Sequence, residues 1–149
     1  MHVRRTALDL RAAQPRDAAA IAALDAQVNP SAWSADAVRD TLRDARGIVA
    51  ESAGGDVRGF VLFALAADQC EILDIAVDPR VQRCGLGARL FVAALVAAAR
   101  AGAMRCLLEV RMSSGGAQAF YRAAGFAEDG RRKGYYRAAG GREDALLMS

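Results

Sequence analysis

The glycine-containing segment from Gln82 to Ala88, QRCGLGA, is the stretch of the sequence best suited to bind an anion. It stands just before a long alanine-rich run that predicts a helix. Glycines allow the backbone to approach a ligand closely, and the free amides of a loop and first helical turn point at a bound anion. The segment therefore predicts a pyrophosphate-binding loop, and a turn that only reverses the chain stays the alternative.

Two other nucleotide-binding loops can be tested on the same residues. A P-loop needs Gly-Lys-Ser or Gly-Lys-Thr, and neither follows Gly87. A Rossmann turn needs a third glycine where this chain has Leu90, and the loop from Asp78 to Cys84 separates strand from glycines. Glu109 stands where the ribose-binding acid of a dinucleotide site would be sought, which keeps that alternative open.

The scarcity of histidine limits the chemistry that the chain can perform. Its sole histidine is His2, so no Ser-His-Asp triad, Cys-His pair or histidine metal cluster can form. A catalytic base must therefore be a carboxylate, a tyrosine or a water molecule. Cys70, Cys84 and Cys106 are far apart in sequence and form no C-x-x-C pair, which argues against a zinc site and for core or incidental roles.

Length and composition favour one domain spanning residues 1–149. A chain of 149 residues that is 54% hydrophobic can bury a core of its own. Its net charge of +3 is spread along the sequence, so no block predicts a nucleic-acid arm or a membrane anchor.

The apolar run from Leu90 to Ala99 is shorter than the stretch of about 20 residues that crosses a bilayer. No signal-peptide pattern is present at the N-terminus, so we expect a cytoplasmic protein with reduced cysteines. The oligomeric state stays open.

The order of apolar stretches and turn signals predicts the secondary structure. We expect strands at about residues 7–12, 47–52, 57–66, 71–77, 106–110, 131–136 and 145–148, and helices at about residues 15–27, 35–44, 87–101 and 116–124. Ser34 is a candidate N-cap, and Gly102 and Gly125 are candidate helix stops. This β-α-α-β-β-β-α-β-α-β-β order predicts an α/β (α+β) fold, a mixed sheet with helices on both faces.

Several motifs together resemble one protein family. The stretch from Leu73 to Pro79, LDIAVDP, followed by QRCGLGA, resembles the acetyl-CoA motif of the GNAT acetyltransferases. The later motifs LEVR, AFY, GF, YY and GREDALLM resemble its branch of bacterial ribosomal-protein-alanine N-acetyltransferases. The resemblance covers nearly the whole chain and is densest from Glu71 to Met148. It implies a GNAT fold whose central sheet is splayed between the fourth and fifth strands.

The resemblance also implies a cosubstrate, acetyl-CoA, and a set of site residues without a metal. The strand residues Ile75, Ala76 and Val77 would offer their backbone to the pantetheine arm. Glu109 of LEVR would act as general base and Tyr121 of AFY as general acid. The pyrophosphate would lie on the loop formed by Arg83, Cys84, Gly85, Leu86, Gly87 and Ala88.

The chemistry of thioester aminolysis agrees with these two catalytic roles. An α-amino group has a pKa of about 7.7 to 8.0, so a carboxylate acting directly or through water can take its proton. A phenol can donate to a departing thiolate, whose conjugate acid has a pKa near 8.5 if it resembles cysteine. No second carboxylate is identified in the sequence as belonging with Glu109, and a single base suits an α-amine better than a lysine.

Each of these residues also has a purely structural interpretation. Glu109 could be a salt-bridged residue at a strand end, and Tyr121 could be a packing residue with its hydroxyl satisfied. Trp33 could staple two helices or line the acceptor groove, with packing favoured. Tyr135 and Tyr136 are adjacent in a strand, so we expect them to face opposite sides, with Tyr136 as a candidate for acceptor contact.

One position departs from the family pattern. The chain has Ser113-Ser114-Gly115-Gly116 where the family usually has Ser-Asn before the helix. Ser114 would then replace an amide that contacts coenzyme A, and its hydroxyl can cap the helix and make a shorter polar contact.

The sequence therefore predicts an enzyme that acetylates the N-terminal alanine of a small-ribosomal-subunit protein by direct attack of its α-amine on the thioester. A GNAT enzyme for another protein N-terminus, a lysine or a small-molecule amine is the first alternative. A non-catalytic acyl-CoA-binding module is the second, and the joint presence of Glu109, Tyr121 and the glycine loop argues against it.

Overall fold

The computed structural model describes residues 7–81 and 85–149, and in this part of the chain the elements follow the expected order. The strands are β1 (Leu8–Ala12), β2 (Arg46–Ser52), β3 (Val57–Ala66), β4 (Gln69–Val77), β5 (Arg105–Arg111), β6 (Glu128–Ala138) and β7 (Gly141–Met148). The helices are α1 (Ala18–Val28), α2 (Ala35–Asp44), α3 (Leu86–Arg100) and α4 (Gly115–Ala123), with short 3-10 turns at Pro15–Asp17 and Pro79–Val81.

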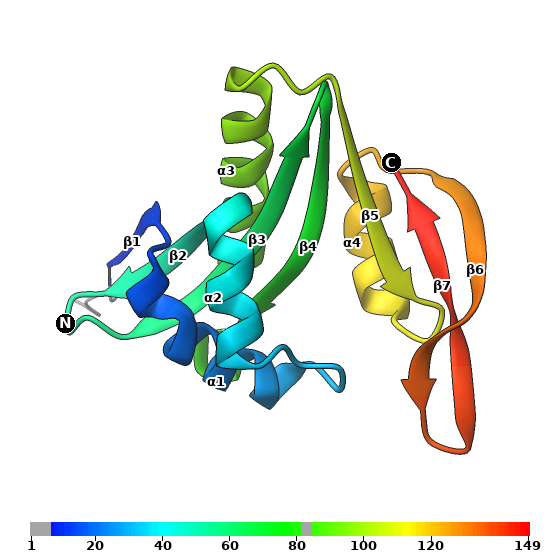
Figure 1. Cartoon of the computed structure of the whole chain (residues 1–149), viewed down its shortest axis with the longest axis horizontal. Helices are drawn as coiled ribbons and strands as arrows, with labels where there is room; N and C mark the ends of the chain where they lie inside the picture. The colour runs from blue at the N-terminus through cyan, green and yellow to red at the C-terminus, as the bar shows by residue number, and fades with distance from the viewer. Residues whose placement is uncertain (1–6, 82–84) are drawn as a thin grey trace, which may run out of the picture.

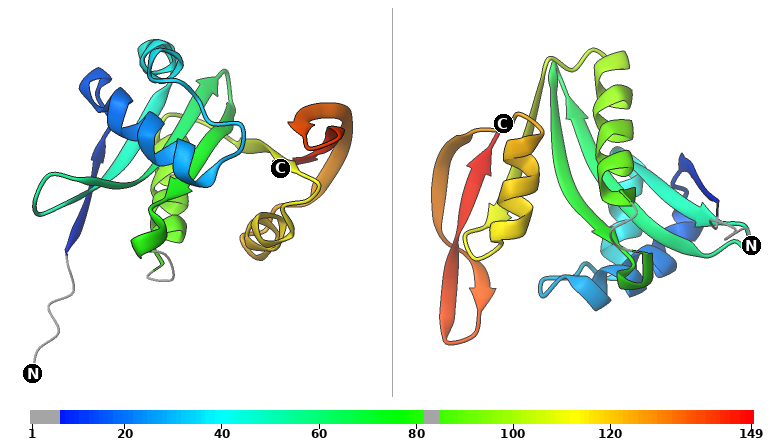
Figure 2. Two further views of the ribbon diagram at one scale, coloured as in Figure 1. Left: turned by 90° about the horizontal axis from the view of Figure 1, so that it is seen from below. Right: turned by 180° about the vertical axis from the view of Figure 1, so that it is seen from behind.

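The strands form one mixed sheet in the order β1-β2-β3-β4-β5-β7-β6. Among these described strands, only the pair of β4 and β5 is parallel, and its pairing runs from Gln69↔Arg105 to Ile72↔Leu108. Beyond that point the two strands separate into the V seen in Figure 1. Figure 2 shows α1 and α2 on one face of the sheet and α3 on the other. The expected sheet, splayed between its fourth and fifth strands with helices on both faces, is confirmed.

An irregularity in β4 lies where the strands begin to separate. In the pairing with β3, Leu62 opposes Asp74 and Phe63 opposes Ile72, so Leu73 is an extra residue on β4. A bulge of this kind bends the strand and increases its twist. The bulge therefore turns β4 away from β5 directly after Ile72 and opens the wedge between the two halves of the sheet.

The core consists of two layers that follow the alternation of side chains along β3. Phe60 and Leu62 pack with α1 and α2, whereas Val61 and Phe63 pack in the cluster that contains α3 and α4. Gly59 shows how closely α3 lies on this sheet, because a Cβ there would stand 2.9 Å from Leu90 Cδ1. Residues of β4 pack in both layers, which positions this strand as one wall of the wedge.

The helix ends agree with the sequence signals. The Ser34 hydroxyl accepts a hydrogen bond from the Ala37 amide at 3.1 Å, as expected of an N-cap. Gly102 and Gly125 both have φ of +97°, a left-handed conformation that favours glycine at a helix end. Strand β6 is longer than expected, because its pairing with β7 continues on both sides of two register shifts. Within residues 7–81 and 85–149, no helix has the length and apolar character needed to span a bilayer.

Candidate active site

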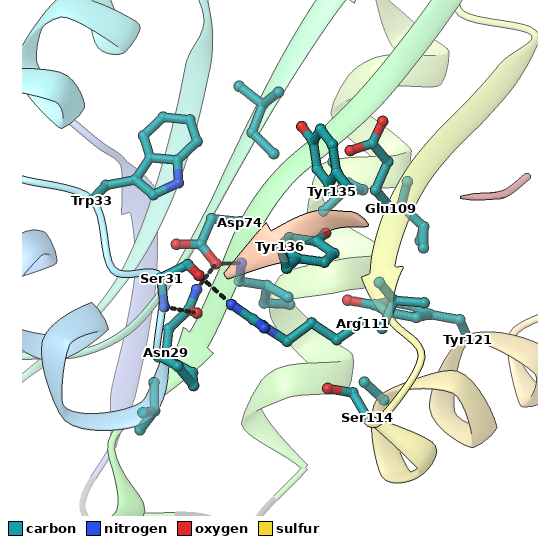
Figure 3. Close-up of a pocket in the computed structure, with 18 of the residues that line it drawn as sticks. Asn29, Ser31, Trp33, Asp74, Glu109, Arg111, Ser114, Tyr121, Tyr135 and Tyr136 are labelled. Carbon is teal, nitrogen blue, oxygen red and sulfur yellow. Dashed lines mark hydrogen bonds between the residues drawn. The ribbon is translucent and has the colours of Figure 1, made fainter. Parts of the chain in front are cut away.

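A cavity of about 420 Å³ opens where β4 and β5 separate. Figure 3 shows side chains from the α1–α2 loop, both strands, α4 and the β6–β7 hairpin converging on it. Its polar lining residues are Asn29, Ser31, Trp33, Glu71, Asp74, Glu109, Arg111, Ser114, Tyr121, Tyr135 and Tyr136. The structure thus brings together Glu109, Tyr121, Ser114, Trp33 and Tyr136, which the sequence singled out separately.

Glu109 lies on β5 directly after Leu108, the last residue of that strand paired with β4. Arg132 Nη1 donates to its Oε1 at 3.0 Å, and the side chain of Glu109 is 22% exposed. Tyr135 also hydrogen-bonds to Glu109, and this bond raises the pKa of Tyr135. The carboxylate is therefore held in place by two partners and still accessible from the cavity, which combines the salt-bridged interpretation with the catalytic one.

Tyr121 on α4 presents an apolar ring to the core and a hydroxyl to the cavity. Its ring centroid lies 5.5 Å from that of Phe91 and 5.4 Å from that of Phe120. Figure 3 shows the hydroxyl pointing into the cavity, and it makes no hydrogen bond to any other described residue. Burial, together with the nearby charge of Asp74, raises the pKa of Tyr121 to about 12. The phenol therefore stays protonated throughout the neutral range and can serve as a hydrogen-bond donor.

Tyr135 and Tyr136 line the same cavity, so the expectation that they face opposite sides is wrong. Their rings meet edge to face with centroids 4.8 Å apart. The physical reason is a register shift in β6 between Arg132 and Tyr136, where Gly134 has φ of +58°. This irregularity breaks the period-two alternation and lets adjacent residues share a face. Tyr136 is half-buried, and burial raises its pKa to about 12.

Arg111, the last residue of LEVR, bridges the two sides of the wedge. It pairs with Glu143 at 2.6 Å and lies 4.5 Å above the ring of Tyr136. A second guanidinium nitrogen donates to the Ser31 hydroxyl in the α1–α2 loop. The sequence resemblance assigned this arginine no role, and only the fold shows that it connects β5, the β6–β7 hairpin and the loop across the cavity mouth.

The cavity contains more carboxyl groups than the sequence indicated. Glu71 and Asp74, on β4, line it as well as Glu109, on β5. The strand pattern could have placed Glu71 and Asp74 on β4, but only the bulge at Leu73 determines which face Asp74 occupies.

The loop expected to bind pyrophosphate leads into the N-terminus of α3. Arg83 and Cys84 lie outside the described residues. Gly85 has φ of +77° at the N-cap, where no side chain caps the helix, so the first amides of α3 have no side-chain acceptor from that position. Leu86 is buried in the core and can offer only its backbone, whereas Gly87 and Ala88 lie nearer the surface. This geometry fits an anion that approaches the helix end.

Asp78 fixes the position of this loop on β4. The carboxylate is 2% exposed and accepts hydrogen bonds from Arg58 at 3.1 Å and Arg80 at 2.7 Å. These guanidinium groups, Arg80 foremost, hold the pKa of Asp78 well below its usual range. Asp78, the second aspartate of the LDIAVDP motif, therefore anchors the turn before α3. Its position before a proline did not indicate this role.

The structure also places the β4 segment after the bulge, Ser114 and Trp33. In the β4 segment, Ile75 lines the cavity, whereas Ala76 is 6% exposed and packs in the core beneath α1 and α2. Ser114 stands at the N-cap of α4 with ψ of 65°, and its hydroxyl makes no cap hydrogen bond, so the expected capping is wrong. Trp33 both packs against the core and lines the cavity.

The side chains that could bind a metal ion are scattered. The described residues contain no group of three or more histidine, cysteine, aspartate or glutamate side chains arranged to hold a metal ion. Cys70 and Cys106 are direct partners across β4 and β5, and a hydrogen bond to Cys70 raises the pKa of the Cys106 thiol. Their pairing was not foreseen from their distance in sequence.

Comparison with known proteins agrees with this geometry. Residues 16–126 match the model of the acetyltransferase (GNAT) family. The chain therefore belongs to the GNAT family and is an acetyltransferase of that class.

The chain is also similar to particular members of the family. It is 37% identical over 95 residues to the [ribosomal protein bS18]-alanine N-acetyltransferase of Escherichia coli strain K12, an alignment that spans 64% of each chain. The crystal structure of the ribosomal-protein-S18-alanine N-acetyltransferase from Escherichia coli superposes with a TM-score of 0.88 at 27% identity, covering 95% of this chain and 92% of that one. The structure of Ard1 from Thermoplasma volcanium gives a TM-score of 0.85 at 25% identity, covering 95% of both chains.

Proposed function

We propose that this chain is one enzyme domain that transfers the acetyl group of acetyl-CoA to the N-terminal α-amine of a protein. The acceptor we propose is the N-terminal alanine of a small-subunit ribosomal protein. One observation carries the proposal: Glu109 and the Tyr121 hydroxyl face one cavity at the point where β4 and β5 separate. The names of the Escherichia coli relatives support the choice of acceptor.

In this proposal, the cosubstrate enters from the side of α3 and the acceptor from the side of the α1–α2 loop. The amides at the N-terminus of α3, after Gly85, would hold the pyrophosphate. The backbone of Ile75 to Val77 would contact the pantetheine arm, and the Ser114 hydroxyl would make a further polar contact. Trp33 and Tyr136, on opposite sides of the cavity mouth, would contact the acceptor.

Glu109 would receive the proton of the attacking amine. An acceptor that arrives as an ammonium group must become neutral before its nitrogen attacks the thioester carbonyl. Because Arg132 and Tyr135 already engage Glu109, a bridging water is a reasonable path for the proton. The bond between nitrogen and the carbonyl carbon forms as the bond between carbon and sulfur breaks.

Tyr121 would stabilise the departing sulfur. Its pKa of about 12 lies above that of a thiol near 8.5, so complete transfer of the phenolic proton to the thiolate would be uphill by roughly 5 kcal/mol. We therefore expect Tyr121 to donate a hydrogen bond to the sulfur in the transition state. This role needs the protonated phenol that burial maintains.

Mass spectrometry of ribosomal proteins from cells with and without the gene tests the acceptor. We expect one small-subunit protein to lose about 42 Da, the mass of an added acetyl group, from its N-terminal peptide when the gene is deleted, and a gene copy carrying Glu109→Gln to leave most of that peptide unmodified. An unchanged set of ribosomal N-termini would instead favour another protein N-terminus, a lysine or a small amine as acceptor.

A further inference from the structure

Two aspartates, the buried Asp25 and the partly buried Asp74, lie beneath the α1–α2 loop, and neither takes part in the proposed proton transfers. Asp25 of α1 is 0% exposed. Asp74, at the bulge of β4, opposes Leu62 and therefore points to the same face of the sheet. Each carboxyl has one oxygen held by amides: the Trp33 amide donates to Asp25 Oδ2 at 2.9 Å, and the Ile75 amide donates to Asp74 Oδ1 at 2.9 Å.

The remaining oxygen of each carboxyl is buried and has no donor. Asp25 Oδ1 and Asp74 Oδ2 accept no hydrogen bond from any described amide, hydroxyl or guanidinium group. The two carboxyl groups interact, since Asp25 is among the groups that raise the pKa of Asp74. Two carboxylates cannot bond to one another, but a carboxylic acid can donate to a carboxylate. One proton shared between them satisfies both oxygens and removes the repulsion of two buried charges.

The pair also holds the loop that forms one wall of the cavity. Asn29 Nδ2 donates to Asp74 Oδ1 at 3.4 Å, and Asn29 Oδ1 accepts from the Ser31 amide at 3.0 Å. Trp33 is attached through its backbone to Asp25. The loop residues Asn29, Ser31 and Trp33 all line the cavity opposite Glu109. Separation of the two aspartates would therefore move the acceptor side of the site.

We propose that Asp25 and Asp74 form a one-proton carboxyl pair that docks the α1–α2 loop on β4 and so sets the affinity of the site for its amine acceptor. Both act as positioning residues, since neither needs to touch the reacting atoms. Burial, followed by the interaction with Asp25, raises the pKa of Asp74 to about 8. Loss of the shared proton would leave two like charges in contact and release the loop.

The charged and ionisable groups around the pair do not supply a substitute proton donor. Tyr121 of α4 and Tyr136 of β6 have raised pKa values, mainly because they are buried and partly because of the negative charge of Asp74. From β5, Arg111 reaches the loop at Ser31 but is paired with Glu143. Strand β3 presents the apolar Leu62. Four of the five charged residues of α2 form ion pairs at the surface, Asp36 with Arg39 and Asp40 with Arg43, and the fifth, Asp44, is the last residue of the helix.

The fluorescence of Trp33, the chain's single tryptophan, tests the pair without any acetyl transfer. In wild type we expect a transition between pH 7 and 9.5, below the range in which Tyr121 and Tyr136 ionise. Asp74→Asn should abolish this transition, because an amide at this position donates permanently to Asp25 Oδ1. If Asp74→Asn fails to fold, Asp25→Asn provides the reciprocal variant. Asp36→Asn is the control: the Asp36 side chain is 92% exposed, and the fluorescence of this variant should change with pH as that of wild type does.

The acceptor side of the inference rests on the proposed function and has its own measurement. At saturating acetyl-CoA, the ratio of wild-type to Asp74→Asn acceptor KM should rise by roughly tenfold for each pH unit above the midpoint, whereas the ratio of their kcat values stays level. Because both enzymes are measured with the same peptide, titration of the peptide's own amine affects both KM values equally and cancels in their ratio. A fluorescence transition that persists in Asp74→Asn, or one absent from wild type, would overturn the pair. A transition that behaves as expected in a protein that acetylates no peptide would retain the pair and overturn only the proposed function.

Discussion

At the scale of single residues, Tyr121 combines a buried aromatic ring with a hydroxyl that makes no hydrogen bond to another described residue. Tyr121→Phe keeps the ring contacts with Phe91 and Phe120 and removes only the hydroxyl. If the hydroxyl acts in the transition state, kcat and kcat/KM should fall together, by on the order of 100-fold. Steady-state kinetics checks this result.

Thermal unfolding supplies the control for Tyr121→Phe. Because the hydroxyl has no hydrogen bond to lose among the described residues, we expect the melting temperature to stay within a few degrees of wild type. Normal turnover with a lower melting temperature would identify Tyr121 as a packing residue and remove it from the mechanism.

Asp17 and Asp74 make opposite contributions to stability as pH changes. The hydrogen bond from Arg11 lowers the pKa of Asp17, so its stabilisation is present above the unfolded value of about 3.9 and is lost as pH falls. Asp74 has a pKa raised to about 8, so its stabilisation is complete below about 3.9 and is lost as pH rises toward 8.

Urea unfolding of wild type and Asp74→Asn between pH 5 and 9 measures this difference. We expect the difference between the free energies of unfolding of the variant and of wild type to increase in favour of the variant, with a slope approaching about 1.4 kcal/mol per pH unit up to pH 8. Above pH 8 this difference should become constant. A constant difference across the range would mean that Asp74 carries its ordinary charge in the folded protein.

At the scale of elements, the loop before α3 depends on one backbone conformation. Gly85 has φ of +77°, and a Cβ added there would have no atom of another described residue within 4 Å, so among these residues a side chain meets backbone strain and not a clash. Gly85→Val should weaken acetyl-CoA binding by tenfold or more, on the order of the 1–2 kcal/mol that the left-handed conformation costs. Isothermal calorimetry measures this change.

Gly102→Val is the matched control, because Gly102 also has a positive φ, +97°, at the other end of α3. It should cost similar stability without changing the dissociation constant of acetyl-CoA. Equal effects of the two variants on binding would assign Gly85 to helix stability alone and favour the simple turn.

At the scale of the whole molecule, periodicity and glycine positions predicted the order of elements well. The alternation along β3 and the helix stops at Gly102 and Gly125 depend on local chemistry, which a sequence displays directly. The bulge at Leu73 and the shift near Gly134 were not predictable, because they depend on strand pairing. These two irregularities are what bring Asp74 and Tyr135 into the cavity, so the site was predicted less completely than the fold.

The number of carboxyl groups in the cavity also changes the argument for an α-amine. With Glu71 and Asp74 lining the same cavity as Glu109, the single-carboxylate reasoning from the sequence no longer separates α-amines from lysines. The difference in the amines themselves remains. At pH 7 about a tenth of α-amino groups are neutral, against about one in a few thousand lysine side chains.

Competition between two peptides tests the central claim most directly. One carries a free N-terminal alanine and no lysine, and the other has a blocked N-terminus and one internal lysine. With purified enzyme and acetyl-CoA at pH 7, we predict that the first is acetylated at least roughly 100-fold faster, following the neutral fractions of the two amines. Equal rates, or faster acetylation of the lysine peptide, would contradict the account and move the chain to a different branch of the GNAT family.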